Sequence, residues 1–287
     1  MENKTLIVAA VLVVAVIFVA GAFVLLPKDN ESSATINVAG STTVQPIMAN
    51  FQEIYEKQHK NVTINITAQG SGTAAPALRN GTADIGMLSR DLNSGESDLR
   101  PLIIAGDAVV IVVDKNSGVT NLTLEQLAKI YSGEYTNWNQ VGGNNLVISP
   151  IVRDSTSGTR EVLDAAMASK LGTSTSDLSK NFNKYSTQGT TGAMLTQVNN
   201  ARGSIGYVNL GSIPVVNTSV TTVISIDGVM PTQQTVLNGT YEISRSLILA
   251  TIGEPTGEVA AFLTWIMSPQ GQKIVEDNDF VPVKPTA

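Results

Sequence analysis

Cysteine is absent from the 287-residue chain, and histidine occurs only once, as His59. The lack of cysteine excludes thiol catalysis, disulfide bonds, cysteine-ligated metals and a lipid-modified cysteine anchor. A single histidine excludes a histidine cluster for a metal, and the polar setting of His59 is more typical of a helix surface than of a Ser–His pair. We therefore expect no metal, no cofactor and no catalytic residue.

Positive charge is also scarce, since 18 Lys and Arg residues oppose 24 Asp and Glu residues for a net charge of −6. Nucleic-acid binding needs a basic face, so this balance argues against a nucleic-acid partner. Aromatic residues make up only 5% of the chain, which fits a packed α/β core better than a carbohydrate-stacking surface. An anion site in this chain must be a local positive feature on an acidic background.

The N-terminal segment has no charged residue over 5–27. About 20 apolar residues span a bilayer as a helix, whereas the core of a signal peptide has about 7–15. A small-residue triplet at 20–22 could serve as a cleavage site, but the apolar run continues beyond it, so we favour an anchor over residues 1–27 to a cleaved signal. Lys4 favours an external C-terminal part, joined by a polar tether at 28–34.

Strands and helices alternate along the rest of the chain. Residues 35–39 and 62–67 alternate apolar and polar side chains, as strands do. Residues 101–114 form a nearly continuous apolar run, which is typical of a strand buried on both faces. Residues 123–133 predict a helix that Gly133 closes. This alternation predicts an α/β fold with parallel sheets flanked by helices.

Several strands end in clusters of glycine, serine and threonine that start the next helix. The clusters are G-S-T-T (40–43), G-S-G-T (70–73), S-R (89–90) and S-T-S-G-T-R (155–160). The N–H groups and the positive dipole end of a helix start favour an anion. Ligands of open α/β sheets bind at the carboxyl ends of strands, so we expect these clusters to form one anion site.

Two simpler interpretations compete with an anion site. Serine and threonine are good N-caps, but capping alone does not require the flanking glycines or the three nearby arginines, whose forks match tetrahedral oxyanions. A catalytic serine is disfavoured because S-T-S-G-T does not match the G-x-S-x-G motif of serine hydrolases and no general base is evident. Nucleotide hydrolysis has no support either, because the Walker motif G-x-x-x-x-G-K-[ST] is absent. We therefore expect a binding protein rather than an enzyme, with an exposed serine hydrolase as the weaker alternative.

The motifs A-G-S-T-T-V-Q-P, Q-G-S-G-T, A-D-I-G-M-L-S-R, V-R-D-S-T-S-G-T-R and G-S-I-G-Y-V occur in this order. Together they make the chain, from about Ile36 to the C-terminus, closely resemble the phosphate-binding proteins that feed ABC phosphate importers. The resemblance implies the periplasmic-binding-protein type II fold, with two α/β lobes, two crossover strands and a ligand between them. The sequence pattern changes after Asp114, which fits the point where the chain passes from lobe 1 to lobe 2. The chain is expected to return to lobe 1 between Gly211 and Ser244.

We accordingly expect lobe 1 at 35–113 and 222–287 and lobe 2 at 114–221, after the N-terminal hydrophobic helix. The resemblance implies an extracytoplasmic, monomeric protein that captures inorganic phosphate and delivers it to an ABC permease in the membrane. The residues that it places at the phosphate are Thr42, Thr43, Thr73, Ser89, Arg90, Arg153, Ser157, Gly158, Thr159 and Arg160.

One position departs from part of the family. Some members have an aspartate at the end of the third strand, where it accepts the proton of hydrogen phosphate, but here Ser89 and Arg90 occupy this junction, and we expect them to donate. A buried carboxylate rejects fully ionised sulfate because two acceptors then face each other. Asp154 or Asp91 could replace that acceptor, so sulfate, molybdate and tungstate stay open as alternative ligands behind phosphate.

Overall fold

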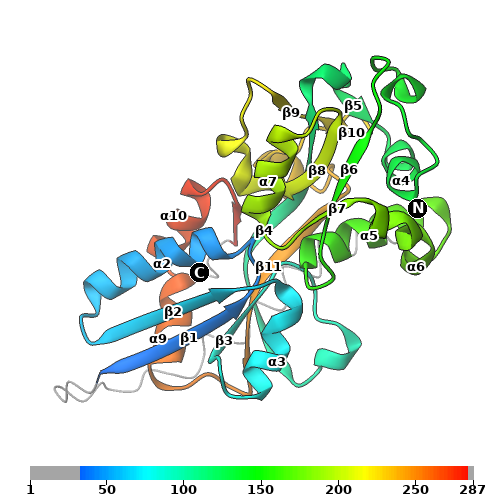
Figure 1. Cartoon of the computed structure of the whole chain (residues 1–287). Helices are drawn as coiled ribbons and strands as arrows, with labels where there is room; N and C mark the ends of the chain where they lie inside the picture. Colours follow the sequence, from blue (N-terminus) through cyan, green and yellow to red (C-terminus); the bar gives the residue numbers. More distant parts are fainter. Residues whose placement is uncertain (1–32, 284–287) are drawn as a thin grey trace.

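The computed structural model describes residues 33–283 (Figure 1). The predicted anchor at 1–27 and most of the predicted tether lie outside the described residues. Within residues 33–283, every helix is too short or too polar to span a membrane.

A single mixed sheet of ten strands organises the fold. Its order is β2-β1-β3-β11-β4-β8-β6-β7, and β9 and β12 pair with β4. The strands are β1 (Ala34–Gly40), β2 (Val62–Ala68), β3 (Ile85–Leu88), β4 (Leu99–Asp114), β6 (Ser149–Arg153), β7 (Ser186–Gln188), β8 (Ser204–Asn209), β9 (Thr221–Val223), β11 (Ser244–Ile252) and β12 (Val281–Pro282); β5 (Asn121–Leu122) and β10 (Ser225–Ile226) form a separate pair.

The prediction of parallel sheets holds only for the outer strands. β1 pairs in parallel with β2 and β3, and β6 with β7 and β8. The two central strands instead run antiparallel to each other and to β3 and β8, because β4 and β11 carry the chain across the molecule in opposite directions. The apolar run predicted at 101–114 is part of β4.

The α-helices pack around this sheet. They are α2 (Gln45–Gln58), α3 (Ala74–Arg79), α4 (Leu124–Ser132), α5 (Gly158–Leu171), α6 (Thr175–Leu178), α7 (Thr191–Asn200), α8 (Gln233–Leu237), α9 (Gly257–Ile266) and α10 (Pro269–Asp277). The predicted end of the helix at Gly133 is confirmed, since Gly133 follows α4 with a φ of 84°.

Two large clusters of buried hydrophobic residues divide the molecule. We call the part of the molecule around each cluster a lobe. The cluster of lobe 1 takes its side chains mainly from β1, α2, β2, β3, β11, α9 and α10. The cluster of lobe 2 takes its side chains mainly from the second half of β4, α4, α5, α7 and β8. β4 serves both, since Ile104 packs in lobe 1 and Val109 in lobe 2. On the return, Ile243 packs in lobe 2 and Leu247 in lobe 1. In Figure 1, β4 and β11 lie at the centre, between the two halves.

Candidate anion-binding site

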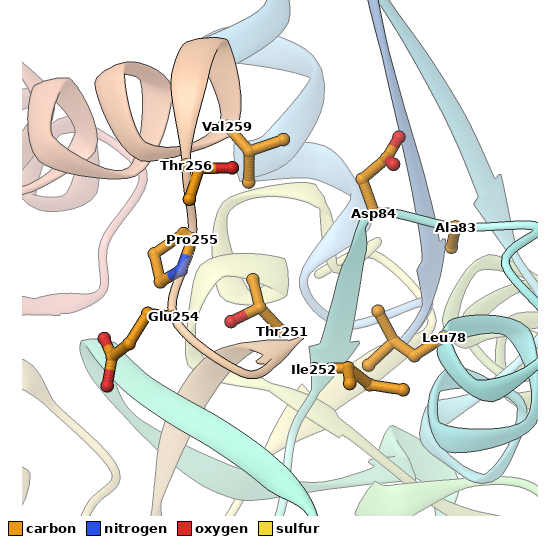
Figure 2. Close-up of a pocket in the computed structure, with 9 residues that line it drawn as sticks. All are labelled: Leu78, Ala83, Asp84, Thr251, Ile252, Glu254, Pro255, Thr256 and Val259. Carbon is orange, nitrogen blue, oxygen red and sulfur yellow. The ribbon is translucent and has the colours of Figure 1, made fainter.

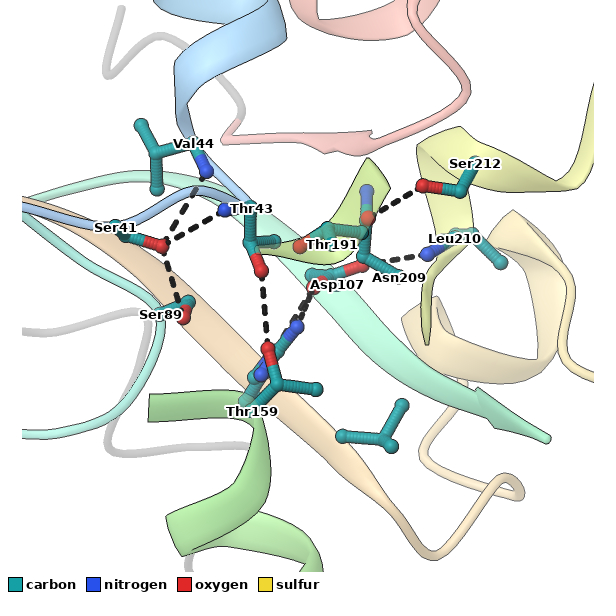
Figure 3. A network of polar contacts seen from close by, with 12 residues as sticks. Ser41, Thr43, Val44, Ser89, Asp107, Thr159, Thr191, Asn209, Leu210 and Ser212 are labelled. Carbon is teal, nitrogen blue, oxygen red and sulfur yellow. Dashed lines mark hydrogen bonds and ion pairs between the residues drawn. The ribbon is translucent and has the colours of Figure 1, made fainter. Parts of the chain in front are cut away.

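Hydroxyl groups of the two lobes meet where β1, β3 and β6 end and α2, α5 and α7 begin. Thr43 Oγ1 lies 3.0 Å from Thr159 Oγ1, and Thr42 Oγ1 lies 3.2 Å from Thr191 Oγ1. All four threonines are buried, and Figure 3 shows the contact between Thr43 and Thr159. Residues 149 and 116 positions apart in the sequence are thus brought together between the lobes, at a place that we call the interlobe site.

The lobe 1 wall of this site is a chain of three buried serines. Ser41 Oγ donates to Ser89 Oγ at 3.0 Å, and Ser71 Oγ lies 3.2 Å from the same atom. Ser41 Oγ also accepts the N–H groups of Thr43 and Val44 at the start of α2 (Figure 3). These serines therefore hold the ends of β1 and β3 together and place small hydroxyl groups at the interlobe site.

The lobe 2 wall is the start of α5. Ser157 is its N-cap, because the Ser157 side chain accepts the N–H of Arg160 at 3.2 Å. The first N–H groups of a helix lack intrahelical partners and carry the positive end of the dipole. Gly158 brings this end against lobe 1, since a Cβ on Gly158 would lie 2.4 Å from Ser71 Oγ. A glycine here is what permits the close approach of the two lobes.

Arg153, at the end of β6, supplies the positive charge. Its side chain is buried, with the residue 1% exposed. The guanidinium donates only to neutral oxygens, namely the backbone carbonyls of Gln188 and Gly189 and the hydroxyls of Thr42 and Thr191. Among residues 33–283, no carboxylate forms an ion pair with it.

An uncompensated buried cation is costly, which explains the direction of its pKa. Burial lowers the pKa of Arg153 from its ordinary value, although nearby Tyr207 and Asp154 oppose the change. Isolated buried charges are normally paired or bound to a ligand. The arrangement can therefore lower its free energy by binding an anion beside Arg153, where hydroxyls and helix N–H groups complete the coordination.

Arg90 lies at the end of β3 and is buried like Arg153, but its guanidinium forms ion pairs with two carboxylates. Its Nη1 and Nη2 donate to Glu96 at 2.7 and 2.8 Å, and its Nε lies 2.7 Å from Glu161 of α5. Burial alone would lower the pKa of Arg90, but the two carboxylates raise it above its ordinary value. The Glu161 contact ties lobe 1 to lobe 2 at the rim of the interlobe site.

Comparisons with known proteins agree with this arrangement. A family model described as "PBP superfamily domain" matches residues 27–270. The phosphate-binding protein PstS of Borreliella burgdorferi is 30% identical over 260 residues, which cover 90% of this chain and 93% of that protein. The chain therefore belongs to the PstS family of phosphate-binding proteins.

Solved structures support the family assignment. A phosphate ABC transporter substrate-binding protein from Clostridium perfringens, solved with bound phosphate, is 31% identical, has a TM-score of 0.79, and is matched over all of its chain and 87% of this one. An ABC-type phosphate transport receptor from Vibrio cholerae is 30% identical with a TM-score of 0.69 and the same coverage. The PstS family fold thus explains the two lobes and the crossing strands.

Besides Arg90, two more residues predicted from the family resemblance lie outside the hydroxyl cluster. Thr73 is only half-buried and donates to the carbonyl of Gly70 within its own turn, at 2.8 Å. Arg160 pairs with Asp164, one turn further along α5, at 3.1 Å, and donates to the carbonyl of Arg153. Arg160 therefore supports the backbone at Arg153 from behind.

Three hydroxyl residues of the cluster were not among the predicted site residues. Ser71 is the serine of the same G-S-G turn as Thr73, and the short helical turn at Ser71–Thr73 points its side chain toward Ser89. Thr191 belongs to the Q-G-T-T-G junction before α7, a signal of the same kind as the other clusters. Ser41 precedes the predicted threonine pair at the first junction.

Neither of the two carboxylates considered as proton acceptors bonds to the hydroxyl cluster. Asp91 is exposed. Asp154 accepts from the N–H and the hydroxyl of Thr156 at 3.0 and 2.7 Å. Thr156 in turn joins the lobes, because its carbonyl accepts the N–H of Gly72 and its hydroxyl donates to the carbonyl of Gln69. Asp154 thus orders a contact between the lobes.

A surface pocket of about 230 Å³ lies apart from the interlobe site, between the start of β3 and the loop before α9 (Figure 2). Its lining includes Asp84 and Glu254, whose carboxylates bind the N–H of Asn37 and the side chain of Arg100. This acidic lining is unsuited to an anion, so the interlobe site is the better candidate.

Proposed function

We propose that the protein captures inorganic phosphate in the interlobe site and delivers it to an ABC permease. The observation that carries this proposal is Arg153, a buried guanidinium without a carboxylate partner that is surrounded by hydroxyl groups of both lobes. Relatives described as phosphate-binding proteins, and one structure with bound phosphate, share the fold.

The interlobe site suits a tetrahedral oxyanion. A guanidinium binds phosphate oxygens through charge-assisted hydrogen bonds, and hydroxyls and helix N–H groups add neutral donors from several directions. Because the donors come from both lobes, the anion connects them and favours their approach. Phosphate would take up the bonds that Thr43 and Thr159 make to each other. This chemistry needs no base or nucleophile, so we propose binding without turnover.

The residues proposed to contact phosphate follow from this arrangement. They are Thr42, Thr43, Ser71, Ser89, Arg153, Gly158, Thr159 and Thr191. Ser157 acts as the cap that orders the start of α5. Arg90 and Arg160 act through their carboxylates and carbonyl partners rather than on the ligand.

The lobes are proposed to move about the two central strands. The packing supports an outward crossing within β4, between Ile104 and Val109, and a return between Ile243 and Leu247. We propose these crossings in place of the lobe boundaries expected from the sequence, after residue 113 and before residue 222. We also retain the proposal that residues 1–27 tether the protein, as a monomer, to the outer face of the cell membrane.

The proposal is tested by titration calorimetry of the full-length chain in a mild detergent with phosphate, sulfate and molybdate in turn. We expect saturable binding of one phosphate per chain and weaker binding of the other two anions. Absence of phosphate binding would overturn the proposed function. Tighter binding of sulfate or molybdate would reassign the ligand within the same site.

A further inference from the structure

A second buried arginine lies at the hinge between the lobes. Arg245 of β11 stands directly opposite Asp107 of β4 in the antiparallel pair. Its Nε donates to Asp107 Oδ2 at 2.8 Å, and its Nη2 lies 2.7 Å from the same oxygen. The other oxygen of Asp107 accepts the N–H of Leu210 at 2.9 Å (Figure 3). Both side chains are almost fully buried, at 3% and 0% exposed.

The Asp107 carboxylate leaves part of this guanidinium unused. Among residues 33–283, neither Nη1 nor Nη2 of Arg245 makes a hydrogen bond, and only Nη2 lies beside Asp107. Buried polar groups are normally satisfied, and a guanidinium N–H left without an acceptor is unfavourable. A purely structural ion pair gives no reason for this unused donor.

The strand register places Arg245 on the same sheet face as a residue that contacts Arg153. Side chains alternate between the faces of a strand, and residues directly opposite each other share a face. On β4, Asp107 and Ile111 therefore share a face, and Ile111 is opposite Tyr207 of β8. The Tyr207 hydroxyl accepts the backbone N–H of Arg153 at 2.8 Å. Arg245 thus lies on the sheet face that also carries the support of Arg153.

Charge in this region is unbalanced. Burial lowers the pKa of Arg153, and the positive charge of Arg245 lowers it further, so the two guanidinium groups are close enough to interact. Asp107 is the single carboxylate that pairs with either of them among the described residues. Asp154 raises the pKa of Arg153 but is only half-buried and forms no ion pair with it, so one of the two buried cations has no carboxylate bonded to it.

We propose that Arg245 is a second cationic residue of the interlobe site, with its Nη1 donating to the bound oxyanion while Asp107 holds the opposite edge of the guanidinium. The inference rests on the proposed function. It adds a ligand contact from a hinge strand to those from the two lobes. An anion between Arg153 and Arg245 would also relieve the repulsion between these two cations.

The test must separate a ligand contact from the loss of a hinge ion pair. Arg245→Gln alone leaves Asp107 buried without its partner, which could unfold the chain for reasons unrelated to phosphate. We therefore compare Asp107→Asn with Asp107→Asn/Arg245→Gln. Both variants lack the ion pair, and they differ only in the guanidinium.

Phosphate affinity of each full-length variant is measured by calorimetry, and folding is checked by thermal unfolding without phosphate. We expect the double variant to bind phosphate about 10- to 100-fold more weakly than Asp107→Asn, as for a lost hydrogen bond to a charged group. Arg245→Lys, which keeps the charge and its pairing with Asp107, should lose less affinity than Arg245→Gln. Arg100→Gln, which removes an exposed arginine far from the site, is the matched control and should bind like the wild type.

Equal phosphate affinity of Asp107→Asn and the double variant would overturn the role of Arg245 and leave the proposed function intact. Equal losses in Arg245→Lys and Arg245→Gln at matched thermal stability would count against a charge-assisted contact. If the wild-type chain itself binds no oxyanion, the proposed function fails, and the proposal for Arg245 fails with it.

Discussion

Arg153 and Arg90 stand at equivalent places, each at the carboxyl end of a strand that faces the interlobe site, yet their surroundings differ. Arg90 is neutralised by Glu96 and Glu161. Arg153 is held by carbonyls and hydroxyls alone. One arginine therefore has its negative partners within the protein, whereas the other is left to be neutralised by a ligand.

The difference teaches that an arginine beside a Gly/Ser/Thr cluster is not by itself a ligand residue. What decides is whether carboxylates take up all of its donor nitrogens, as they do for Arg90. Arg90 helps to hold the lobes together through Glu161, and Arg153 makes their approach depend on an anion. Removing each in turn should therefore have different consequences.

The largest effect is expected from Arg153→Met. Loss of the unpaired guanidinium should weaken phosphate binding by about 3–5 kcal/mol, because a buried anion then loses its charged partner. Calorimetry with Arg90→Met as the matched variant checks the comparison. Arg90→Met should lose clearly less affinity, and an equal loss in both variants would contradict the distinction drawn between them.

The next largest loss of phosphate affinity is expected from Gly158→Ala. The added Cβ would lie 2.4 Å from Ser71 Oγ and hold the lobes apart, at a cost typical of overpacking, about 1–3 kcal/mol of binding free energy. Stability without phosphate should change less than phosphate affinity, because the lobes can separate to relieve the overlap and alanine is the better helix former. The control is Gly192→Ala in the first turn of α7, where a Cβ meets nothing within 4 Å. Retained wild-type affinity in Gly158→Ala would show that close approach at this point is not needed.

Asp164 gives a pH-dependent prediction for the helix that supports Arg153. Burial raises the pKa of Asp164 from 3.8 to about 6, although Arg160 opposes the change. The folded chain therefore binds this proton more tightly than the unfolded chain, and its stabilising effect is lost as the pH rises through about 6. Relative to wild type, Asp164→Asn should gain up to about 3 kcal/mol of stability between pH 4 and 7. Denaturant unfolding at several pH values measures this, and a difference independent of pH would refute it.

The smallest effect is expected from Glu161→Gln. Glu161 is 46% exposed, and ion pairs with exposed partners contribute about 0–1 kcal/mol. Phosphate should therefore dissociate only a few-fold faster, as measured by stopped-flow, with Arg90 still held by Glu96. A loss as large as that of Arg153→Met would mean that the Arg90 contact, rather than the ligand, dominates closure.

Much of the site could be predicted because its chemistry is local. The start of α5 needs a cap and glycine within a few residues, so Ser157, Gly158 and Thr159 were recognisable from the S-T-S-G-T-R stretch. The strand at 101–114 was recognisable because burial on both faces leaves a continuous apolar run.

The remaining features depend on contacts between distant segments. Nothing near Arg160 in the sequence marks it as less suited than Arg153 to bind an anion. Only the fold shows that its guanidinium already bonds to Asp164 and to the carbonyl of Arg153. Thr73 and Ser71 are equally good hydroxyls, and the geometry of one short turn decides which faces Ser89. The antiparallel central strands could not be predicted either, because strand direction depends on where the chain crosses between lobes.

The most direct test of the account is a crystal structure of the protein with phosphate. We predict that the anion lies between the lobes, bonded to the guanidinium of Arg153 and to Thr43 and Thr159, while Arg90 stays paired with Glu96. Phosphate bound to Arg90 instead, with Arg153 still held only by its neutral oxygens, would contradict the central claim.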